Sequence, residues 1–200
     1  NYIESVTIRE GVKRLGNGLF QNCSELREIV LPQSLLSIGD HAFDACESLT
    51  EINIPSKVRE IGKEAFNNCH DLAAINVDAG NDHYSAEADI LNNKDHSILL
   101  KASEKLDGDI ILAGGLEKIE AYAFNACASI RKVIIPESVT EIGAYAFAAC
   151  RALEEIKLPK RLNRIEESTF EQTAIKSITI GSAVVYIGVN AFNSCTSLEE

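Results

Sequence analysis

The sequence predicts a solenoid: a right-handed superhelix of stacked repeats, with a parallel β-sheet on one face and short helical or irregular segments on the other. The first observation is that all seven phenylalanines recur in one frame, at Phe20, Phe43, Phe66, Phe124, Phe147, Phe170 and Phe192. The second is that all six cysteines lie three residues after one of these phenylalanines, and all four prolines lie eleven residues before one. Three uncommon residue types in one phase indicate a structural unit that repeats about every 23 residues.

Each unit begins with a short strand, which is clearest in the copy from Leu49 to Cys69. Leu49, Ile52 and Ile54 place apolar side chains at alternating positions, and isoleucine favours strands. Pro55 then ends backbone pairing because proline has no N–H. We therefore expect one parallel strand in each unit, with the apolar residues pointing inward and the intervening residues pointing outward.

The rest of the unit consists of a second extended piece and a tight turn of the chain. Residues 58–62 (VREIG) are again prone to form a strand, and Gly62 suits a turn with unusual dihedral angles. Residues 63–69 (KEAFNNC) predict about one helical turn with its apolar residues on one side. Because no single unit can bury its own apolar face, stacked units should form internal ladders of phenylalanine and of cysteine.

The cysteines can be interpreted as metal ligands, as disulfides or as buried thiols. Metal ligands usually cluster at short spacings such as C-x-x-C, and a spacing of about 23 residues does not do so. Neighbouring rungs lie about 4.8 Å apart, so distance alone allows a disulfide. Side chains in register point in parallel, however, and the run Cys23, Cys46 and Cys69 cannot pair off. Thr173 in the same slot indicates a demand for small size, so we expect free thiols.

The long gap between Phe66 and Phe124 marks a departure from the regular pattern. We expect a single repeat array over residues 1–200, with regular repeats at 1–74 and 113–200 and a variant repeat at about 75–112. Within the variant repeat, Ile90–Asn92 and Ser97–Leu100 flank a turn at residues 93–96 and predict a β-hairpin insertion. The variant repeat is the one interruption of the array at which we expect a pocket.

Charge and hydropathy exclude several classes of partner. The formal net charge of -11 disfavours nucleic acid and an anionic membrane surface, because both would repel the chain. No apolar run approaches the roughly 18 residues that a membrane helix needs. Residues 1–20 lack the basic start and apolar block of a signal peptide. The chain has no methionine and begins within a repeat, so we expect a fragment of a longer protein.

Residue spacing gives no support for catalytic, metal or cofactor chemistry. The histidines are His41, His70, His83 and His96, and no pair has the H-x-x-x-H spacing of a helical zinc site. Asp78, Asp82 and Asp89 match no EF-hand loop, and aspartate is common in turns. No nucleophile elbow, P-loop or dinucleotide-binding loop occurs. We therefore expect no enzyme activity, no metal and no cofactor.

The outward strand positions form the candidate partner-binding surface, because stacking places them side by side on one exposed sheet. The candidate residues are Arg27, Glu28, Glu51, Asn53, Asn76, Arg131, Lys132, Glu154, Glu155, Lys157 and Lys176. Charges of both signs alternate along this row, and aromatic residues, the usual interface anchors, are missing from it. Tyr122 and Tyr145 share a different phase and should stack at an edge. The alternative interpretation is that the row consists merely of solvated strand residues.

The repeat, written L-x-x-I-x-[IL]-P-x-x-[VL]-x-x-I-G-x-x-A-F-x-x-C, resembles the BspA-like (Treponema-type) leucine-rich repeat family over nearly the whole chain. The clearest copies are EINIPSKVREIGKEAFNNC (Glu51–Cys69) and KVIIPESVTEIGAYAFAAC (Lys132–Cys150). Asn81–Asp95 (NDHYSAEADILNNKD) is similar to an insertion that usually reads N-P-x-Y-x-S-x-D-G-V-L-x-N-K-D, but it lacks the Pro and the D-G-V. The resemblance implies a leucine-rich repeat solenoid on secreted or surface proteins of bacteria and some protozoa, associated with adhesion to host proteins or other cells.

Two functions from different classes follow. The first is a non-catalytic protein-binding module, secreted or at the cell surface, whose partner is a host matrix protein, a cell-surface protein or another protein. Such a partner would dock on the outward row or on the hairpin near Asn92–His96. The second is a passive structural spacer or accessory domain that displays another domain of a longer surface protein. The fixed positions of the repeat are core positions, so they specify the fold and not the ligand.

Overall fold

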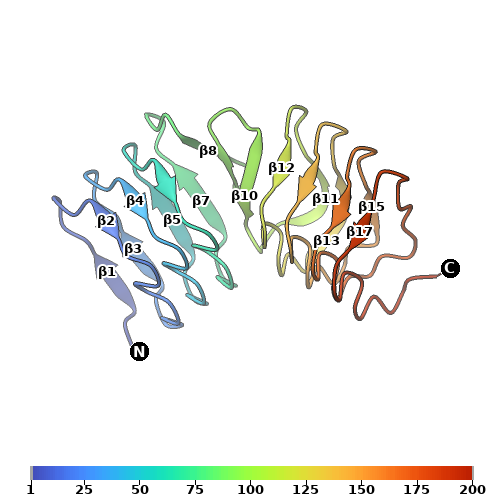
Figure 1. Ribbon diagram of the computed structural model, residues 1–200. Coiled ribbons are helices and arrows are strands. Elements are labelled where there is room, and N and C mark those ends of the chain that lie inside the picture. The colour runs from blue at the N-terminus through green and yellow to red at the C-terminus, as the bar shows by residue number, and fades with distance from the viewer. Residues whose placement is uncertain (1, 200) are drawn as a thin grey trace. The chain divides into compact units, whose positions relative to one another are not determined.

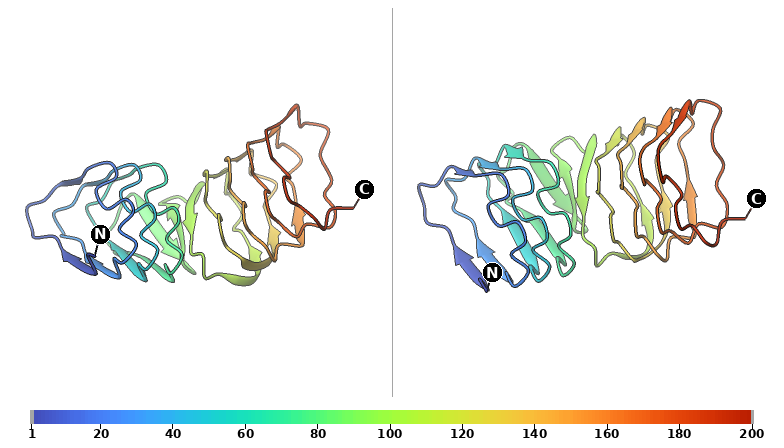
Figure 2. Two further views of the ribbon diagram at one scale, coloured as in Figure 1. Left: turned by 90° about the horizontal axis from the view of Figure 1, so that it is seen from below. Right: turned by 60° about the horizontal axis from the view of Figure 1, so that its bottom comes forward.

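The computed structural model describes residues 2–199 and divides into two compact units, the first up to Lys94 and the second from Asp95 (Figures 1 and 2). Each unit is a β-solenoid in which successive turns of the chain stack as rungs, as the repeat predicts. A regular rung carries two short strands. We call the strands of the L-x-x-I-x-I segments the first ladder and those of the V-x-x-I segments the second ladder.

The first unit contains both ladders and ends in a hairpin. Its first ladder comprises β1 (Ser5–Thr7), β3 (Glu28–Val30), β5 (Glu51–Ile54) and β7 (Ala74–Val77). Its second ladder comprises β2 (Arg14–Leu15), β4 (Ser37–Ile38) and β6 (Glu60–Ile61), and the hairpin comprises β8 (Tyr84–Glu87) and β9 (Ile90–Asn93). The paired ladder strands are parallel, and like residues meet in register, as Ile52 meets Ile75 and Ile38 meets Ile61.

The second unit repeats this arrangement. Its first ladder comprises β11 (Asp107–Ile111), β13 (Ser129–Ile134) and β15 (Glu155–Lys157). Its second ladder comprises β10 (Ile98–Ala102), β12 (Lys118–Ile119), β14 (Glu141–Ile142), β16 (Arg164–Ile165) and β17 (Tyr186–Ile187). The paired strands are again parallel, and the register of β11 against β13 shifts between Gly108 and Asp109.

The phenylalanines form the predicted ladder in the core of each unit. In the first unit the rings of Phe20, Phe43 and Phe66 are stacked, with centroids 5.5 and 5.6 Å apart. The second unit has the stacked pairs Phe124–Phe147, Phe147–Phe170 and Phe170–Phe192, with centroids 5.1, 5.8 and 5.5 Å apart. Stacked rings fill the interior that no single rung could close by itself.

The segment around each phenylalanine is irregular, and the helical turn that we expected is not formed; residues 2–199 contain no helix. The backbone is left-handed two residues before and two residues after each phenylalanine, with φ between 49° and 62°. These residues are Gly18, Asn22, His41, Ala45, Glu64, Asn68, Tyr122, Ala126, Tyr145, Ala149, Ser168, Gln172, Asn190 and Ser194. The N–H groups of Phe43 and Ala45 accordingly donate to the next rung, at Ala65 O and Asn67 O, 2.8 and 2.9 Å away. Backbone hydrogen bonds between rungs therefore take the place of the hydrogen bonds that a helix would form within the segment.

Gly62 is required for a reason other than the one the sequence suggested. Its φ is not in the left-handed region. A Cβ atom at Gly62 would instead lie 2.3 Å from the backbone nitrogen of Asp40 in the preceding rung. Gly143 is in the same situation, because a Cβ there would lie 2.3 Å from the nitrogen of Ala121. The glycine thus permits the close approach of two rungs.

The six cysteines are free thiols, buried except for the half-buried Cys195. Four of the thiols donate to the carbonyl of the phenylalanine one rung earlier, as Cys69 Sγ does to Phe43 O at 3.2 Å and Cys150 Sγ to Phe124 O at 3.1 Å. Cys127 Sγ donates instead to Ser103 O at 3.4 Å. Thr173 in the same slot donates instead to Phe170 O of its own rung at 2.9 Å. The small side chains in this slot, Thr173 included, thus donate to backbone carbonyls.

The variant repeat contributes a hairpin at a place that the sequence did not indicate. Strands β9 and β10 lie at the positions expected to flank a turn, on either side of residues 94–97, and the first unit has in addition an antiparallel hairpin formed by β8 and β9. Its turn residues Ala88 and Asp89 both have positive φ, as a type I′ turn requires. At its base, the hydroxyl of Tyr84 accepts the N–H of Ile61 at 3.0 Å. The hairpin thus covers a backbone group of β6.

Candidate functional site

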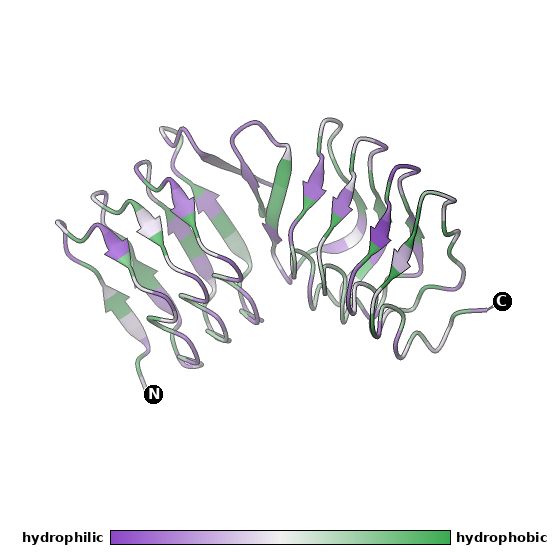
Figure 3. Cartoon of the chain, in the orientation of Figure 1, coloured by the Kyte–Doolittle hydropathy of each residue, from purple (hydrophilic) through white to green (hydrophobic). Residues whose placement is uncertain are grey.

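The candidate residues lie on or beside the first ladder of each unit, and all are exposed except Lys132, which is half-buried. We call these residues the first-ladder row. The part in the first unit comprises Arg27, Glu28, Glu51, Asn53 and Asn76, and the part in the second unit comprises Arg131, Lys132, Glu154, Glu155, Lys157 and Lys176. Along β5, exposed hydrophilic residues alternate with buried hydrophobic ones, and Figure 3 shows that the strands carry both hydrophilic and hydrophobic residues. The predicted exposure of the row is therefore present.

In the first unit, an amide network joins β5 to β7. Asn53 and Asn76 are partners in register. The side-chain amide of Asn76 donates to Glu51 Oε1 at 2.8 Å and to Asn53 Oδ1 at 3.0 Å. The amide of Asn53 donates to the same Glu51 oxygen at 2.9 Å. These three side chains hold one another in place across neighbouring rungs.

In the second unit, charges of the row pair with each other across rungs. Lys132 Nζ lies 2.6 Å from Glu155 Oε1, and Lys176 Nζ lies 2.5 Å from Glu154 Oε2. The hydrogen bond from Lys176 lowers the pKa of Glu154, and the hydrogen bond to Glu155 raises the pKa of Lys132. The alternating charges therefore form ordered ion pairs along the row.

Lys157, the last charge of this row on β15, reaches sideways to the preceding rung. Its Nζ lies 3.2 Å from Glu137 Oε1. The pKa of Glu137 is lowered, first by the backbone N–H of Lys160 and then by the hydrogen bond from Lys157. A partner that docks here would meet a patterned surface of fixed charges.

An apolar pair interrupts the charges of this row. Ile111 on β11 and Ile134 on β13 are partners in register and are 75% and 43% exposed. The alternation of the regular repeat places Ile134 on the outward side, whereas Ile111 belongs to the variant repeat, where that alternation gave no indication of its position. Tyr122 and Tyr145 stack as predicted, with ring centroids 4.8 Å apart, on a different side of the rung.

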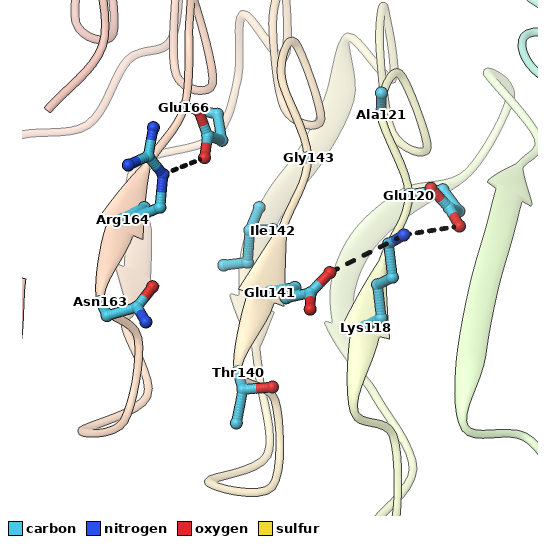
Figure 4. Close-up of a pocket in the computed structure, with 10 residues that line it drawn as sticks. All are labelled: Lys118, Glu120, Ala121, Thr140, Glu141, Ile142, Gly143, Asn163, Arg164 and Glu166. Atoms are coloured by element: carbon cyan, nitrogen blue, oxygen red, sulfur yellow. Dashed lines mark hydrogen bonds and ion pairs between the residues drawn. The ribbon is translucent and has the colours of Figure 1, made fainter. Parts of the chain in front are cut away.

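A hollow of about 470 Å³ lies on the second ladder of the second unit, over β12, β14 and β16 (Figure 4). It is lined by Lys118, Glu120, Ala121, Thr140, Glu141, Ile142, Gly143, Asn163, Arg164 and Glu166. Lys118 Nζ lies 3.1 Å from Glu120 Oε1, and Arg164 Nε donates to Glu166 Oε1 at 2.6 Å. Our expectation of a pocket only at the variant repeat was wrong. The available signal was glutamate after isoleucine, at residues 120 and 166, where other rungs have glycine.

The part of the chain that the structure describes contains no group of three or more His, Cys, Asp or Glu side chains placed to hold a metal ion. Across residues 2–199, no helix has the length and the apolar character needed to cross a bilayer.

Comparisons with known proteins agree with the repeat pattern. The family model for the BspA type leucine rich repeat region matches residues 1–93 and 105–200, in six copies. A leucine rich cell surface protein from Faecalibacterium prausnitzii is 34% identical, with a TM-score of 0.92 over 98% of this chain and 52% of that chain. No curated protein matches the sequence.

Two further solved structures share the fold. The pneumococcal vaccine antigen PcpA is 24% identical, with a TM-score of 0.94 over 98% of this chain and 49% of that one. A leucine rich repeat protein of T. pallidum is 26% identical, with a TM-score of 0.52 over 100% of this chain and 80% of that one. The chain spans about half the length of the first two proteins. The family model covers most of the sequence, and the chain therefore belongs to the BspA type leucine-rich repeat family.

Proposed function

We propose that this chain is a non-catalytic protein-binding module of a longer protein at the cell surface, with a role in adhesion or partner recognition. The observation that carries the proposal is the contrast between the two sides of each first-ladder strand. Inward positions repeat the same residue types, whereas the exposed outward positions differ from rung to rung. An extended surface with a rung-specific pattern is how repeat proteins recognise other proteins.

The surface location is supported by the relative from F. prausnitzii, which is described as a cell surface protein. The docking surface that we propose is the first-ladder row. In its second-unit part, the exposed pair Ile111 and Ile134 supplies an apolar centre beside the Lys132–Glu155 ion pair. Apolar anchors surrounded by polar groups are typical of interface centres. The second docking position that we propose is the segment Asn92–His96, expected from the sequence as a hairpin turn, in which Asn92 is buried and Lys94 is exposed.

The ion pairs allow a test that changes the charge pattern without leaving a charge unpaired. One variant exchanges the charges of a pair, Lys132→Glu with Glu155→Lys, and a second does the same with Glu154→Lys and Lys176→Glu. A matched control, Lys63→Glu with Glu64→Lys, exchanges charges on the irregular side of the first unit. The readout is saturable binding to a panel of immobilised matrix proteins and to cells.

We expect both first-ladder exchanges to weaken binding by about tenfold or more and the control exchange to have little effect, because misplaced charges at an interface repel the partner. Equal binding by all three variants would show that the row is the wrong surface. A passive spacer is the alternative function, and it predicts that the unmodified chain binds no protein of the panel saturably.

A further inference from the structure

The rung of β17 carries an apolar patch where the other regular rungs are polar. Each rung presents three outward positions at the second ladder: the two residues before the isoleucine or leucine that ends the strand, and the second residue after it. In the rungs of β2, β4, β6, β12, β14 and β16, at least two of these three residues are polar or charged. In the rung of β17 they are Val185, Tyr186 and Val189, which we call the β17 patch.

The β17 patch is exposed because its side chains point away from the stack of rungs. Val185 is 83% exposed, Val189 is 68% exposed and Tyr186 is 41% exposed. In the preceding rung, Asn163 and Glu167 hold the positions of the two valines, and they are exposed although β17 stacks on that rung. A further rung beyond β17 would therefore leave Val185 and Val189 exposed as well. Neighbouring exposed apolar side chains on an otherwise polar surface indicate an interaction site.

The aromatic ring of the patch is held in place by the preceding rung. The guanidinium carbon of Arg164 lies 4.0 Å from the centroid of the Tyr186 ring. Arg164 Nε in turn donates to Glu166 Oε1 at 2.6 Å, which fixes the guanidinium. Tyr186 therefore loses little side-chain freedom when a partner contacts it. A tyrosine flanked by apolar side chains is a typical anchor of a protein interface.

The border of the patch is acidic. Glu167 lies in the rung beside Val189, where its Oε1 accepts the hydroxyl of Tyr145 at 2.8 Å, and no cation among the described residues forms an ion pair with it. The pKa of Tyr145 is raised, first by this hydrogen bond and also by the charge of Glu171 nearby. The charge of Arg164 is already balanced by its own ion pair. The patch thus combines an apolar centre with a border of net negative charge.

We propose that the β17 patch is a docking surface for a basic amphipathic segment of a partner protein, with apolar side chains on the patch and a lysine or arginine beside Glu167. The apolar side chains of the segment remove Val185, Val189 and the ring of Tyr186 from water. The cation meets a carboxylate that has no cation of its own, and a charge-assisted hydrogen bond forms. An anionic membrane or a second copy of this chain, with its net charge of -11, is repelled by the same charges. The patch lies on the second ladder, so the proposal does not depend on the first-ladder row.

The test is an NMR titration of the isotope-labelled chain with the peptide acetyl-Lys-Leu-Lys-Leu-Lys-Leu-Lys-amide, in which basic and apolar side chains alternate. Two comparison peptides separate the two contributions: one has glutamate in place of every lysine, and the other has serine in place of every leucine.

The variants change one contribution at a time. Val185→Ser and Val189→Ser each remove an apolar contact, and Glu167→Gln removes the carboxylate charge while it keeps an acceptor for Tyr145. The matched controls in the first unit are Leu19→Ser, at an exposed apolar residue, and Glu25→Gln, at an exposed carboxylate. All of these side chains except Glu167 are exposed without a printed-out role in packing, so the variants should fold as the unmodified chain does.

We expect saturable shifts of the backbone amides of residues 163–167 and 185–190 with the lysine–leucine peptide, and weaker binding of both comparison peptides. Each valine variant should bind about three- to tenfold more weakly, because less apolar surface is buried. Glu167→Gln should bind about two- to fivefold more weakly, as for the loss of an exposed ion pair, and both controls should bind as the unmodified chain does.

Equal weakening by Glu167→Gln and Glu25→Gln would show a general attraction of an acidic chain and would overturn the proposal. Unchanged binding by the valine variants, equal binding of either comparison peptide, scattered shifts or a lack of saturable binding would also overturn it. A dimer in analytical ultracentrifugation that Val185→Ser abolishes would assign the patch to a second copy of the chain and would overturn it as well.

Discussion

The left-handed residues two positions before and after each phenylalanine are conformationally unfavourable, and hydrogen bonds between rungs offset this loss of stability. A residue with a Cβ atom loses about 1–2 kcal/mol in this conformation. Within the fold, the cost is offset because alternating left-handed residues turn successive N–H groups towards the next rung, as at Phe147 N to Thr169 O, 2.9 Å, and Ala149 N to Glu171 O, 2.8 Å. Nothing in the apolar spacing of the sequence reports these dihedral angles, which is why the pattern was interpreted as a helical turn.

Glycine should therefore stabilise the chain at these positions, although it destabilises most others. Ala45→Gly and Ala149→Gly, at φ of 57° and 58°, remove the clash of the Cβ atom. Glycine costs about 0.5–1 kcal/mol in lost chain entropy, so the expected net gain is about 0.5–1 kcal/mol in the free energy of unfolding for each change. Denaturant titration measures it. The control Ala146→Gly, at a buried residue without positive φ, should lose stability; a loss in all three variants would refute the argument.

The buried thiols make the fold sensitive to alkali. Burial raises the pKa of Cys46 and of Cys127 from 9.0 to about 12. Below about pH 9 these thiols are protonated in both the folded and the unfolded chain, so their full contribution to stability is present. Between about pH 9 and 12 the unfolded chain loses these protons first, so the free energy of unfolding falls as the pH rises.

We predict that this fall is measurable between about pH 8 and 11 and is smaller in Cys46→Ala, which removes one titrating thiol. Cys195→Ala, at a half-buried thiol, is the matched control. All six thiols should react with a thiol reagent after denaturation without reductant and slowly before it. An alkaline fall that is the same in Cys46→Ala as in the unmodified chain would assign it to other groups.

At the scale of the elements, each rung is stabilised by the rungs that it contacts. Phe147 is fully buried, with Phe124 and Phe170 stacked on either face of its ring. Phe192 is half-buried and is stacked on one neighbour, Phe170. The two positions have the same side chain in the same slot, so they form a natural comparison.

Phe147→Ala should lower the free energy of unfolding by about 3–5 kcal/mol, the usual cost of removing a buried aromatic ring. It should also speed hydrogen exchange at the backbone N–H groups of Phe124 and Phe170, because each rung supports the next. Phe192→Ala should cost clearly less. Equal costs, or exchange that changes only in the mutated rung, would contradict the ladder as the source of stability.

The regular rungs could be predicted from the sequence, whereas the variant repeat could not. Phenylalanine and isoleucine in a fixed phase determine which side chains stack, so the strands and the ring ladder followed directly. In the variant repeat, polar side chains take over the role of backbone partners: buried Asn81 donates to Pro55 O and Val58 O, both at 2.9 Å. A single sequence does not show that an asparagine will be buried and bonded in this way, so β8 and its hairpin were missed.

The phase break before Phe124 has a related explanation. Ala102 N donates to Ala123 O at 2.8 Å, the bond that a phenylalanine makes in a regular rung, so alanine occupies the phenylalanine position there. Nearby, Lys101 Nζ and Glu104 Oε1 form a buried ion pair at 3.2 Å.

The exposure of the first-ladder row could be predicted from the sequence, as the core could. It followed from the alternation of apolar and polar residues along each strand. The ion pairs within it, Ile111 and the hollow depended on contacts between rungs.

For the whole molecule, the charge distribution bears on the kind of partner that we propose and on the conditions under which it would bind. The surface of the described residues shows ion pairs along both ladders of the second unit, and the net charge of -11 repels nucleic acid and anionic membranes. Fixed charges of both signs at an interface increase the specificity and the association rate more than they increase the affinity. Recognition of a protein partner by this chain should therefore be electrostatic in character, with the exposed Ile111 and Ile134 as a small apolar contribution.

Binding of a protein partner should accordingly weaken as salt is added. The distance over which exposed charges act falls from about 10 Å at 0.1 M ionic strength to about 3 Å at 1 M. We expect the association rate to fall strongly over this range and the dissociation rate to change little, because steering acts before contact. Surface plasmon resonance at several salt concentrations separates the two rates. The exchange of Lys132→Glu with Glu155→Lys keeps the net charge but inverts the local pattern, so it should slow association at 0.1 M and should differ less from the unmodified chain at 1 M. A partner whose association rate is independent of salt would instead be held by apolar contacts, and Ile134→Ser would then be the variant that releases it.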